Sequence, residues 1–137
     1  MANYIKVANL NIKSIGCYKK KIITNEVILT KERLDWHILM YHKNEYKQLE
    51  KYLNKIIEEP DYILEDSTHI DTLIFLKHIE EIEKKARVVV KLATDINEKI
   101  YNKNSIITIM RQRNKSWEQT LKNRGKIIYK KMLDISE

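Results

Sequence analysis

Apolar positions at helical intervals predict two helices in the first half of the chain. The first covers residues 31–42 and the second residues 45–59, where apolar residues recur every three or four positions. Thr30 is a good N-cap for the first helix, because its hydroxyl can accept a hydrogen bond from a backbone N–H that the helix leaves without a partner. Pro60 ends the second helix, since the residue before a proline is pushed out of the helical conformation.

Shorter apolar runs, several of them rich in β-branched residues, predict strands before and after these helices. The predicted strands cover residues 4–7, 26–29, 61–66, 69–79, 86–94, 104–113 and 126–132. A further short helix is predicted over residues 116–123, with Ser116 at or near its N-cap. Strands that follow one another without long helices between them predict an antiparallel meander. The predicted fold class is therefore α+β, with the helices packed on one face of a sheet.

The composition describes one globular domain. The chain has 137 residues, 43% of them hydrophobic and 33% charged, and shows no internal repeat. It has no apolar run long enough to span a membrane and no secretory pattern at its start. A single cysteine, Cys17, excludes an internal disulfide and a cysteine cage for zinc. We expect a cytoplasmic protein, or one delivered into the cytoplasm of a target cell.

Positive charge is unevenly spread along the chain. The net charge is +4 over residues 1–45, −4 over 46–85 and +7 over 86–137, which together make the chain's +7. A basic C-terminal third beside an acidic middle suits a protein with one surface that attracts a polyanion such as RNA or DNA. A solvated basic face with no ligand explains the same numbers, so charge alone leaves both alternatives open.

The stretch ERLDWHILMYH (32–42) holds two histidines, His37 and His42, in an apolar helical run. On a regular helix they point about 140° apart, whereas two histidines that bind zinc from one helix are usually four residues apart. We therefore expect no metal and no cofactor here. Trp36 and Met40 fall opposite the main apolar stripe, so the helix is apolar almost all round and is predicted to be largely buried.

Arg33, His37 and Tyr41 share one edge of this helix. Together they form a cationic group that can exchange protons, which suits chemistry on a phosphate. A histidine beside a core stripe is more often structural, so both interpretations of His37 stay open. The catalytic one requires this edge to face other polar residues across a cleft.

Basic and aromatic residues are interleaved over residues 111–131. This segment holds eight Lys/Arg and one acid, Glu118, with Trp117 and Tyr129 among them. Cations that bind phosphates and rings that stack on bases suit single-stranded nucleic acid, although Trp117 can equally anchor its short helix in the core. The candidate phosphate-binding residues of the whole chain are Arg33, Arg111, Arg113, Lys115 and Lys131.

Two polar residues interrupt strands that are otherwise apolar. Lys91 lies within RVVVKLA, where it indicates either a solvated face or a cleft that faces phosphate. Thr108 is the lone hydroxyl on its face of the strand 104–113, where it either pairs with a neighbouring strand or faces a ligand.

Six segments in this order resemble one nuclease group. They are VILTKERL, HIxxxH (His37, Ile38 and His42), IIEEPDYILED, VVVKLAT, NSIIT and LKN…KIIYKK. The order is similar to the phage and mobile-element branch of the Barnase-EndoU-Colicin-RelE (BECR) like nucleases. The similarity runs over residues 26–131 and leaves 1–25 as an N-terminal extension of a single nuclease-like domain, 1–137. It implies N-terminal helices packed on a four-stranded antiparallel sheet.

The resemblance also implies an activity. It implies a metal-independent endoribonuclease that uses the 2′-OH of RNA, with tRNA as a candidate substrate, and leaves a 2′,3′-cyclic phosphate. Such a protein would be a toxin-type effector of a phage or mobile element, with an immunity protein or antitoxin as partner. The family's helix histidine, second histidine, basic strand residue, hydroxyl and late tyrosine correspond to His37, His42, Lys91, Thr108 and Tyr129. Tyr41 stands where the family usually has arginine, which motivates the alternative of a non-catalytic RNA-binding or regulatory domain on the same fold.

Overall fold

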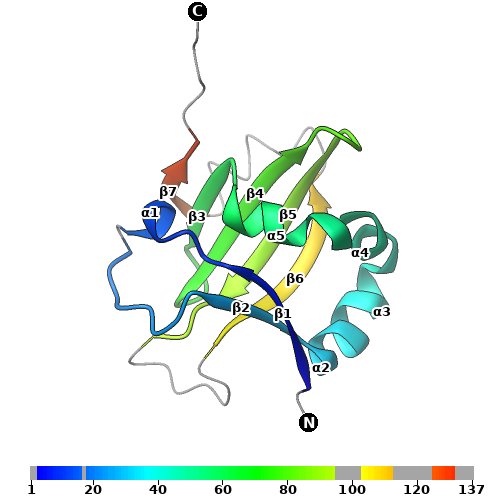
Figure 1. The fold of residues 1–137 in the computed structure, drawn as a ribbon, viewed down its shortest axis with the longest axis horizontal. Helices are drawn as coiled ribbons and strands as arrows, with labels where there is room; N and C mark the ends of the chain where they lie inside the picture. The colour runs from blue at the N-terminus through cyan, green and yellow to red at the C-terminus, as the bar shows by residue number, and fades with distance from the viewer. Residues whose placement is uncertain (1–2, 17, 95–102, 113–124, 132–137) are drawn as a thin grey trace, which may run out of the picture.

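The computed structural model describes residues 3–16, 18–94, 103–112 and 125–131, which form a mixed α+β fold around one twisted sheet (Figure 1). The strands are β1 (Tyr4–Asn9), β2 (Glu26–Thr30), β3 (Tyr62–Asp66), β4 (Thr72–Ile79), β5 (Lys84–Lys91), β6 (Asn104–Gln112) and β7 (Gly125–Lys130). They lie in the order β1-β2-β6-β5-β4-β3-β7. The α+β class is therefore as predicted.

The expectation of a four-stranded antiparallel sheet beneath N-terminal helices is wrong. The sheet has seven strands, because the N-terminal pair β1 and β2 and the C-terminal β7 join the meander of β3 to β6. Two strands also precede the main helical segment. The pairing of β2 with β6 is parallel, with Val27 opposite Asn104 and Ile28 opposite Ser105, while the other neighbouring strands are antiparallel.

The helical part begins and ends close to where the sequence predicts. After α1 (Ile12–Ile15), the main segment consists of α2 (Lys31–Arg33), the π-helical turn η1 (Leu34–Ile38), α3 (Leu39–Tyr41), α4 (Lys43–Leu49), η2 (Glu50–Tyr52) and α5 (Leu53–Glu58). The predicted N-cap is confirmed, because Thr30 Oγ1 accepts a hydrogen bond from the Arg33 N–H at 3.1 Å. The last helix ends two residues before Pro60.

The main core lies between these helices and one face of the sheet. Helix α5 crosses one face of the sheet, and β1 curls from the sheet edge toward α5 and contacts it (Figure 1). The Asn9 N–H donates to Glu58 Oε2 at 2.9 Å, which ties β1 to the end of α5. Fully buried side chains such as Ile56, Phe75 and Val88 fill the space between the two layers. Each contributes about 1.5–3 kcal/mol through the apolar surface that it removes from water.

A second, smaller apolar cluster lies on the opposite face of the sheet, which we call the far face. Leu64, Ile74 and Leu76 are buried there, and Val89 packs against them. Because side chains alternate along a strand, Leu73 and Phe75 face the helices while Ile74 and Leu76 face away. This explains why LIFL is a continuous apolar run, and it gives the far face an apolar floor.

Some predicted features lie outside the described residues. They are the helix over 116–123, together with Cys17, Arg113, Lys115 and Trp117. No helix in the described part of the chain is long and apolar enough to cross a membrane.

Candidate functional site

A hollow of about 450 Å³ lies on the far face of the sheet, and we call it the sheet hollow. Its lining comes from β3, β4, β5 and β6 and from the loop between β3 and β4. The lining residues are Asp66, His69, Thr72, Ile74, Arg87, Val89, Lys91, Ile107, Thr108 and Met110. Two of the predicted site residues, Lys91 and Thr108, are thus brought together, and charged and hydroxyl groups surround an apolar floor.

The two cations of the sheet hollow come from one strand. Arg87 and Lys91 lie on either side of Val89 on β5, at alternate positions that share the far face. Arg87 donates to Met110 Sδ, and Lys91 Nζ donates to the carbonyl oxygen of Ile70. Two cations therefore line the hollow against one carboxylate, Asp66, and this balance of charge suits an anion such as a phosphodiester.

Thr108 reaches the hollow because of a β-bulge. Val89 pairs with Thr108 but Val90 pairs with Ile106, so Ile107 is an extra residue that re-aims the strand. Thr108 Oγ1 is buried and makes no hydrogen bond with any residue that the structure describes. A buried hydroxyl without a partner costs free energy. A bound substrate oxygen would supply the missing partner.

His69 is an acid–base group that the sequence reasoning missed. Its Nδ1 lies 3.2 Å from Asp66 Oδ2 and 2.9 Å from Thr68 Oγ1. Burial alone raises the pKa of Asp66, but hydrogen bonds from Thr68 and His69 outweigh it and lower that pKa. An ionised carboxylate can only accept hydrogen bonds, so Nδ1 carries the proton and Nε2 can accept one. The side chain of His69 is 72% exposed and is within reach of a substrate.

The loop behind the sheet hollow is held by a buried acid, Asp71. Its carboxylate accepts a hydrogen bond from the Tyr18 hydroxyl at 2.7 Å and pairs with Lys20 Nζ at 3.1 Å. The side chain of Asp71 is 3% exposed and that of Lys20 is 17% exposed. Its carbonyl oxygen accepts the Leu92 N–H at 2.7 Å. Although burial raises the pKa of Asp71, the bonds from Tyr18 and Lys20 lower it overall. Asp71 therefore ties this loop to the backbone immediately after Lys91.

The two helix histidines do not point apart as predicted. The rings of His37 and His42 are 5.9 Å apart, centroid to centroid. The regular wheel is wrong here for two reasons. Residues 34–38 form a wider π-helical turn, with the Leu39 N–H bonded to the Leu34 carbonyl, and His42 leaves the helix at φ −137°. Burial and the positive charge of Arg33, with a smaller effect of His42, lower the pKa of His37.

The prediction that this helix is largely buried is also wrong. Trp36, Met40 and Tyr41 are 71%, 60% and 68% exposed. The segment is anchored by Ile38, which is fully buried, and by partly buried leucines. The apolar residues all round the helix therefore exceed what the sheet can cover, and one side stays in contact with solvent.

The other predicted site residues are divided between different places. His42 Nδ1 lies 3.1 Å from Glu45 Oε1, and Glu45 Oε2 accepts the backbone N–H of Arg111 at 2.6 Å, so the Arg111 backbone is bonded to α4. Arg33 and His37 line a separate hollow that shares no lining residue with the sheet hollow. Tyr129 packs against the main core, and Lys131 lines a third hollow. The structure thus groups Lys91 with Thr108, and Arg33 with His37 and His42, while the Arg111 guanidinium donates to Gln48 Oε1 at 3.3 Å.

Sequence comparison identifies one family. A family model described as phage-Barnase-EndoU-ColicinE5/D-RelE like nuclease2 matches residues 8–130. No curated protein and no solved structure matches the chain.

Proposed function

The chain belongs to this family of nuclease-like domains, as its sequence motifs predict, and we propose that it is a metal-independent endoribonuclease whose reaction centre is the sheet hollow. One observation carries the proposal. The Asp66–His69 pair stands at the same hollow as the cations Arg87 and Lys91 and the hydroxyl of Thr108. An acid–base group, two phosphate-binding cations and a hydroxyl are the components that cleavage of RNA through its own 2′-OH requires.

His69 starts the reaction in this proposal. Its Nε2 takes the proton of the ribose 2′-OH, and the 2′-oxygen attacks the adjacent phosphorus. The bond from phosphorus to the 5′-oxygen breaks as His69 Nε2 gives the proton that it took from the 2′-OH to that oxygen. The products are a 2′,3′-cyclic phosphate and a 5′-hydroxyl end. Asp66 keeps the imidazole in the required tautomer and stabilises its charged form.

Arg87 and Lys91 stabilise the negative charge of the phosphate. Negative charge builds up on its non-bridging oxygens as the 2′-oxygen attacks, and two cations held at the hollow stabilise that charge more than they stabilise the ground state. We expect Thr108 to turn its hydroxyl toward the same phosphate, because this satisfies a group that has no hydrogen bond within the described residues. Each of these contacts is worth roughly 100-fold in rate.

His37 is the competing candidate for the base. It has Arg33 and His42 beside it, and the charges of both act on its pKa. We favour His69, because His69 lines the hollow that also contains Lys91 and Thr108, whereas His37 lines a different one. We assign Tyr129 no contact with the phosphate, since it packs against the core beneath the helices.

The test is to incubate the purified protein with total RNA in EDTA and to map the cut ends. We expect cyclic phosphate ends from the wild type and a loss of about 100-fold or more in His69→Ala, with His37→Ala as the matched histidine control. Cleavage that requires added divalent metal would overturn the mechanism. Full activity in His69→Ala combined with a loss in His37→Ala would move the base to the helix. RNA binding without cleavage at any enzyme concentration would establish the non-catalytic alternative.

We further propose a biological role as a toxin-type effector of a phage or mobile element, acting in a cytoplasm on RNA, with tRNA as the candidate substrate and a cognate immunity protein as partner. The family's phage association supports this proposal. Expression of the wild type in a bacterium should arrest growth while His69→Ala should not. Unimpaired growth with the wild type would argue against a potent toxin.

A further inference from the structure

Two exposed rings, Trp36 and Tyr41, and the half-buried ring of His37 lie on η1 and α3, and we call these three residues the aromatic ledge. Trp36 and Tyr41 are 71% and 68% exposed, and the ring of His37 lies 5.6 Å from that of Tyr41, tilted by 59°. The fully buried Ile38 holds the segment against the sheet. A fixed backbone that presents large rings to water suits a partner that stacks on them.

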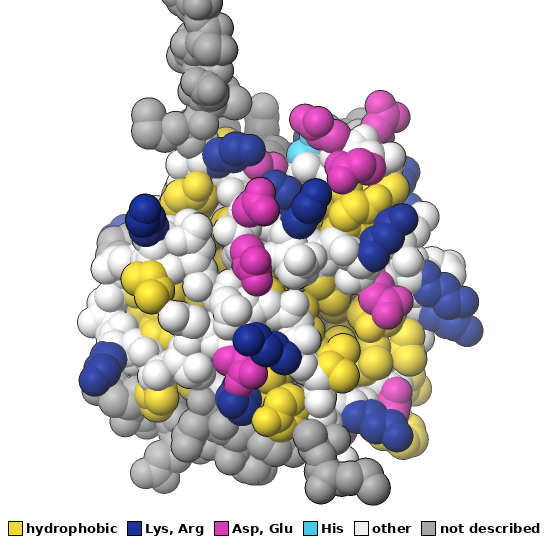
Figure 2. Space-filling model, in the orientation of Figure 1, with side chains coloured by type: hydrophobic (Ala, Val, Ile, Leu, Met, Phe, Trp, Pro, Cys, Tyr) yellow, Lys and Arg dark blue, Asp and Glu magenta, His cyan; other side chains and the backbone are white. Residues whose placement is uncertain are grey.

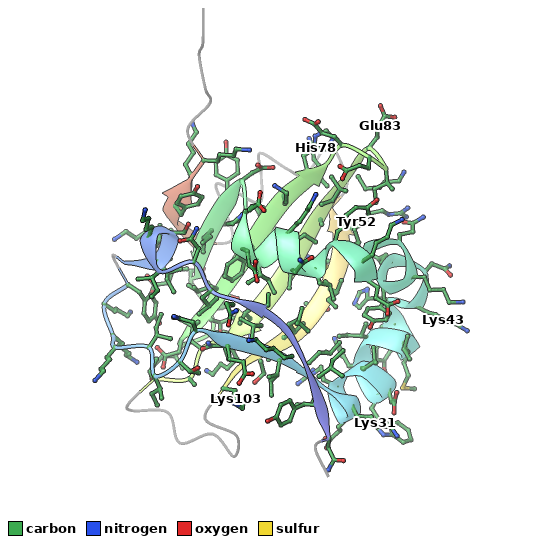
Figure 3. The ribbon with its side chains drawn as sticks, viewed as in Figure 1. Lys31, Lys43, Tyr52, His78, Glu83 and Lys103 are labelled. Carbon is green, nitrogen blue, oxygen red and sulfur yellow. The ribbon has the colours of Figure 1, made fainter. Side chains whose placement is uncertain are left out.

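A hollow of about 810 Å³ lies beside the ledge and has the size of a ligand site. Trp36 and His37 line it together with the cations Lys31 and Arg33. Figure 3 labels Lys31, at the start of α2, and Lys43, at the start of α4, on the outer side of the molecule. Rings and cations that alternate over one surface match the alternation of bases and phosphates along a single strand.

Two carboxylates in the same hollow limit where a phosphate can lie. Glu32 and Asp35 line it along with Lys31 and Arg33. Carboxylates repel phosphates but accept hydrogen bonds from the amino groups of bases. Figure 2 shows the same mixture over this whole face, where basic and acidic side chains are interspersed and hydrophobic ones gather on the side where α2 to α4 lie. Stacking and base contacts, more than bulk charge, would therefore determine binding here.

The ledge and the sheet hollow are linked by β6. The helices η1 and α4 contact β6, and this helical part lies beside β6 in Figure 1. The other face of β6 contributes Thr108 to the sheet hollow. The parallel pairing with β2 extends only over Asn104 and Ser105, and farther along β6 the backbone N–H of Arg111 donates to Glu45 of α4. A nucleic-acid strand that passes round η1 and α4 beside β6 would meet both surfaces.

We propose that the aromatic ledge binds unpaired bases of a single-stranded RNA segment that flanks the cleavage site. One base stacks on Trp36 and another on Tyr41, while Lys31 and Arg33, which line the hollow with Trp36, bind a phosphate on the Trp36 side. Bases within a duplex are already stacked on each other, so the ledge selects single-stranded segments. The position of the bound segment beside a cleavage site rests on the proposed function, but the binding itself does not depend on catalysis.

The experiment measures equilibrium binding of a short single-stranded 2′-O-methyl oligoribonucleotide, which cannot be cut through its 2′-oxygen. Trp36→Ala should bind about tenfold more weakly than the wild type, and Trp36→Phe, which keeps a ring, should recover most of the affinity. Ile12→Ala is the matched control, since Ile12 is a 62% exposed apolar residue on α1. It should bind like the wild type. The same sequence in a duplex should bind more weakly than the single strand.

Equal binding by Trp36→Ala and the wild type would overturn the proposal, and so would equal binding of duplex and single strand. If the aromatic ledge binds a protein instead, Trp36→Ala and the wild type would bind the oligonucleotide equally well. The two proposals also fail separately. If binding depends on the rings but the protein cuts no unmodified RNA, the proposal for the aromatic ledge holds and the nuclease proposal fails. If Trp36→Ala changes neither the rate nor the KM of RNA cleavage, the nuclease proposal holds and the proposal for the aromatic ledge fails.

Discussion

Val89 and Thr108 stand directly opposite each other on β5 and β6, and both side chains line the sheet hollow. Val89 belongs to the apolar floor, whereas Thr108 introduces a buried hydroxyl that bonds to none of the described residues. A valine would fit the apolar surroundings at position 108 as well. The hydroxyl therefore reduces stability, which is typical of groups that are present for binding or catalysis.

Replacing Thr108 by valine should raise stability and lower activity together. The free energy of unfolding should rise by about 1 kcal/mol, because a buried polar group without a partner is removed. RNA cleavage should fall about 100-fold. Urea denaturation and initial-rate measurements check the two effects. Thr108→Ser keeps the hydroxyl and should retain activity, and a Thr108→Val protein that is less stable than the wild type would show that the hydroxyl is bonded.

The pKa of Asp66 predicts how stability depends on pH. This pKa is lowered in the folded protein, since the hydrogen bonds from Thr68 and His69 outweigh burial. The ionised carboxylate therefore stabilises the fold fully above its unfolded pKa of about 3.9, and this contribution is lost as the pH falls through the lower folded value. Asp66→Asn should be less stable than the wild type at pH 7, and the difference should shrink below about pH 4. A difference that stays constant with pH would contradict this.

The pKa of His37 should depend on Arg33. Burial, then the Arg33 guanidinium and then His42 lower it from the ordinary histidine value. In Arg33→Met the repulsion is lost, so the His37 pKa should rise toward about 6.5. An NMR titration of the imidazole protons measures the shift. His42→Gln is the control, and it should raise the same pKa by a smaller amount. An unchanged pKa in Arg33→Met would mean that the Arg33 charge does not contribute to the shift.

Asp71→Asn should destabilise the protein by about 3 kcal/mol, because it leaves Lys20 without its partner in a largely buried place. Chemical denaturation measures the loss. The matched control is Lys19→Gln, which removes an ion pair with Glu65 at a lysine whose side chain is 64% exposed. That change should cost less than about 1 kcal/mol. Equal losses in the two variants would show that burial does not decide the strength of the Asp71 pair.

Local patterns predicted the elements well because they report on local physics. The cap at Thr30 and the stop before Pro60 follow from hydrogen bonding and steric exclusion within a few residues. The partners of the strands are decided by packing between distant segments, so the parallel pairing of β2 with β6 has no signal in the spacing of apolar residues. The number of strands in one sheet was missed for the same reason.

Part of the candidate site was predictable. Lys91 and Thr108 were found because each interrupts an apolar strand, and the structure places both at one hollow. His69 was missed because it was included in a predicted strand that begins at Thr72 instead. The signal was an aspartate at position 66 followed by Ser67 and Thr68, a sequence that favours a turn. The meeting of His37 with His42 depends on a π-helical turn, which a regular wheel cannot represent.

The parallel pairing of β2 with β6 also has a consequence for the order of folding. Val27 reaches Asn104 only after a long loop of chain has closed, whereas β4 and β5 close over a short turn. Loop-closure entropy therefore favours early folding of the meander and late docking of β1 and β2, together with the helix that follows them. Contacts made last are the first to open when conditions become less favourable. A substrate strand bound to both the aromatic ledge and the sheet hollow would thus connect the part of the domain that docks last to the part that folds first.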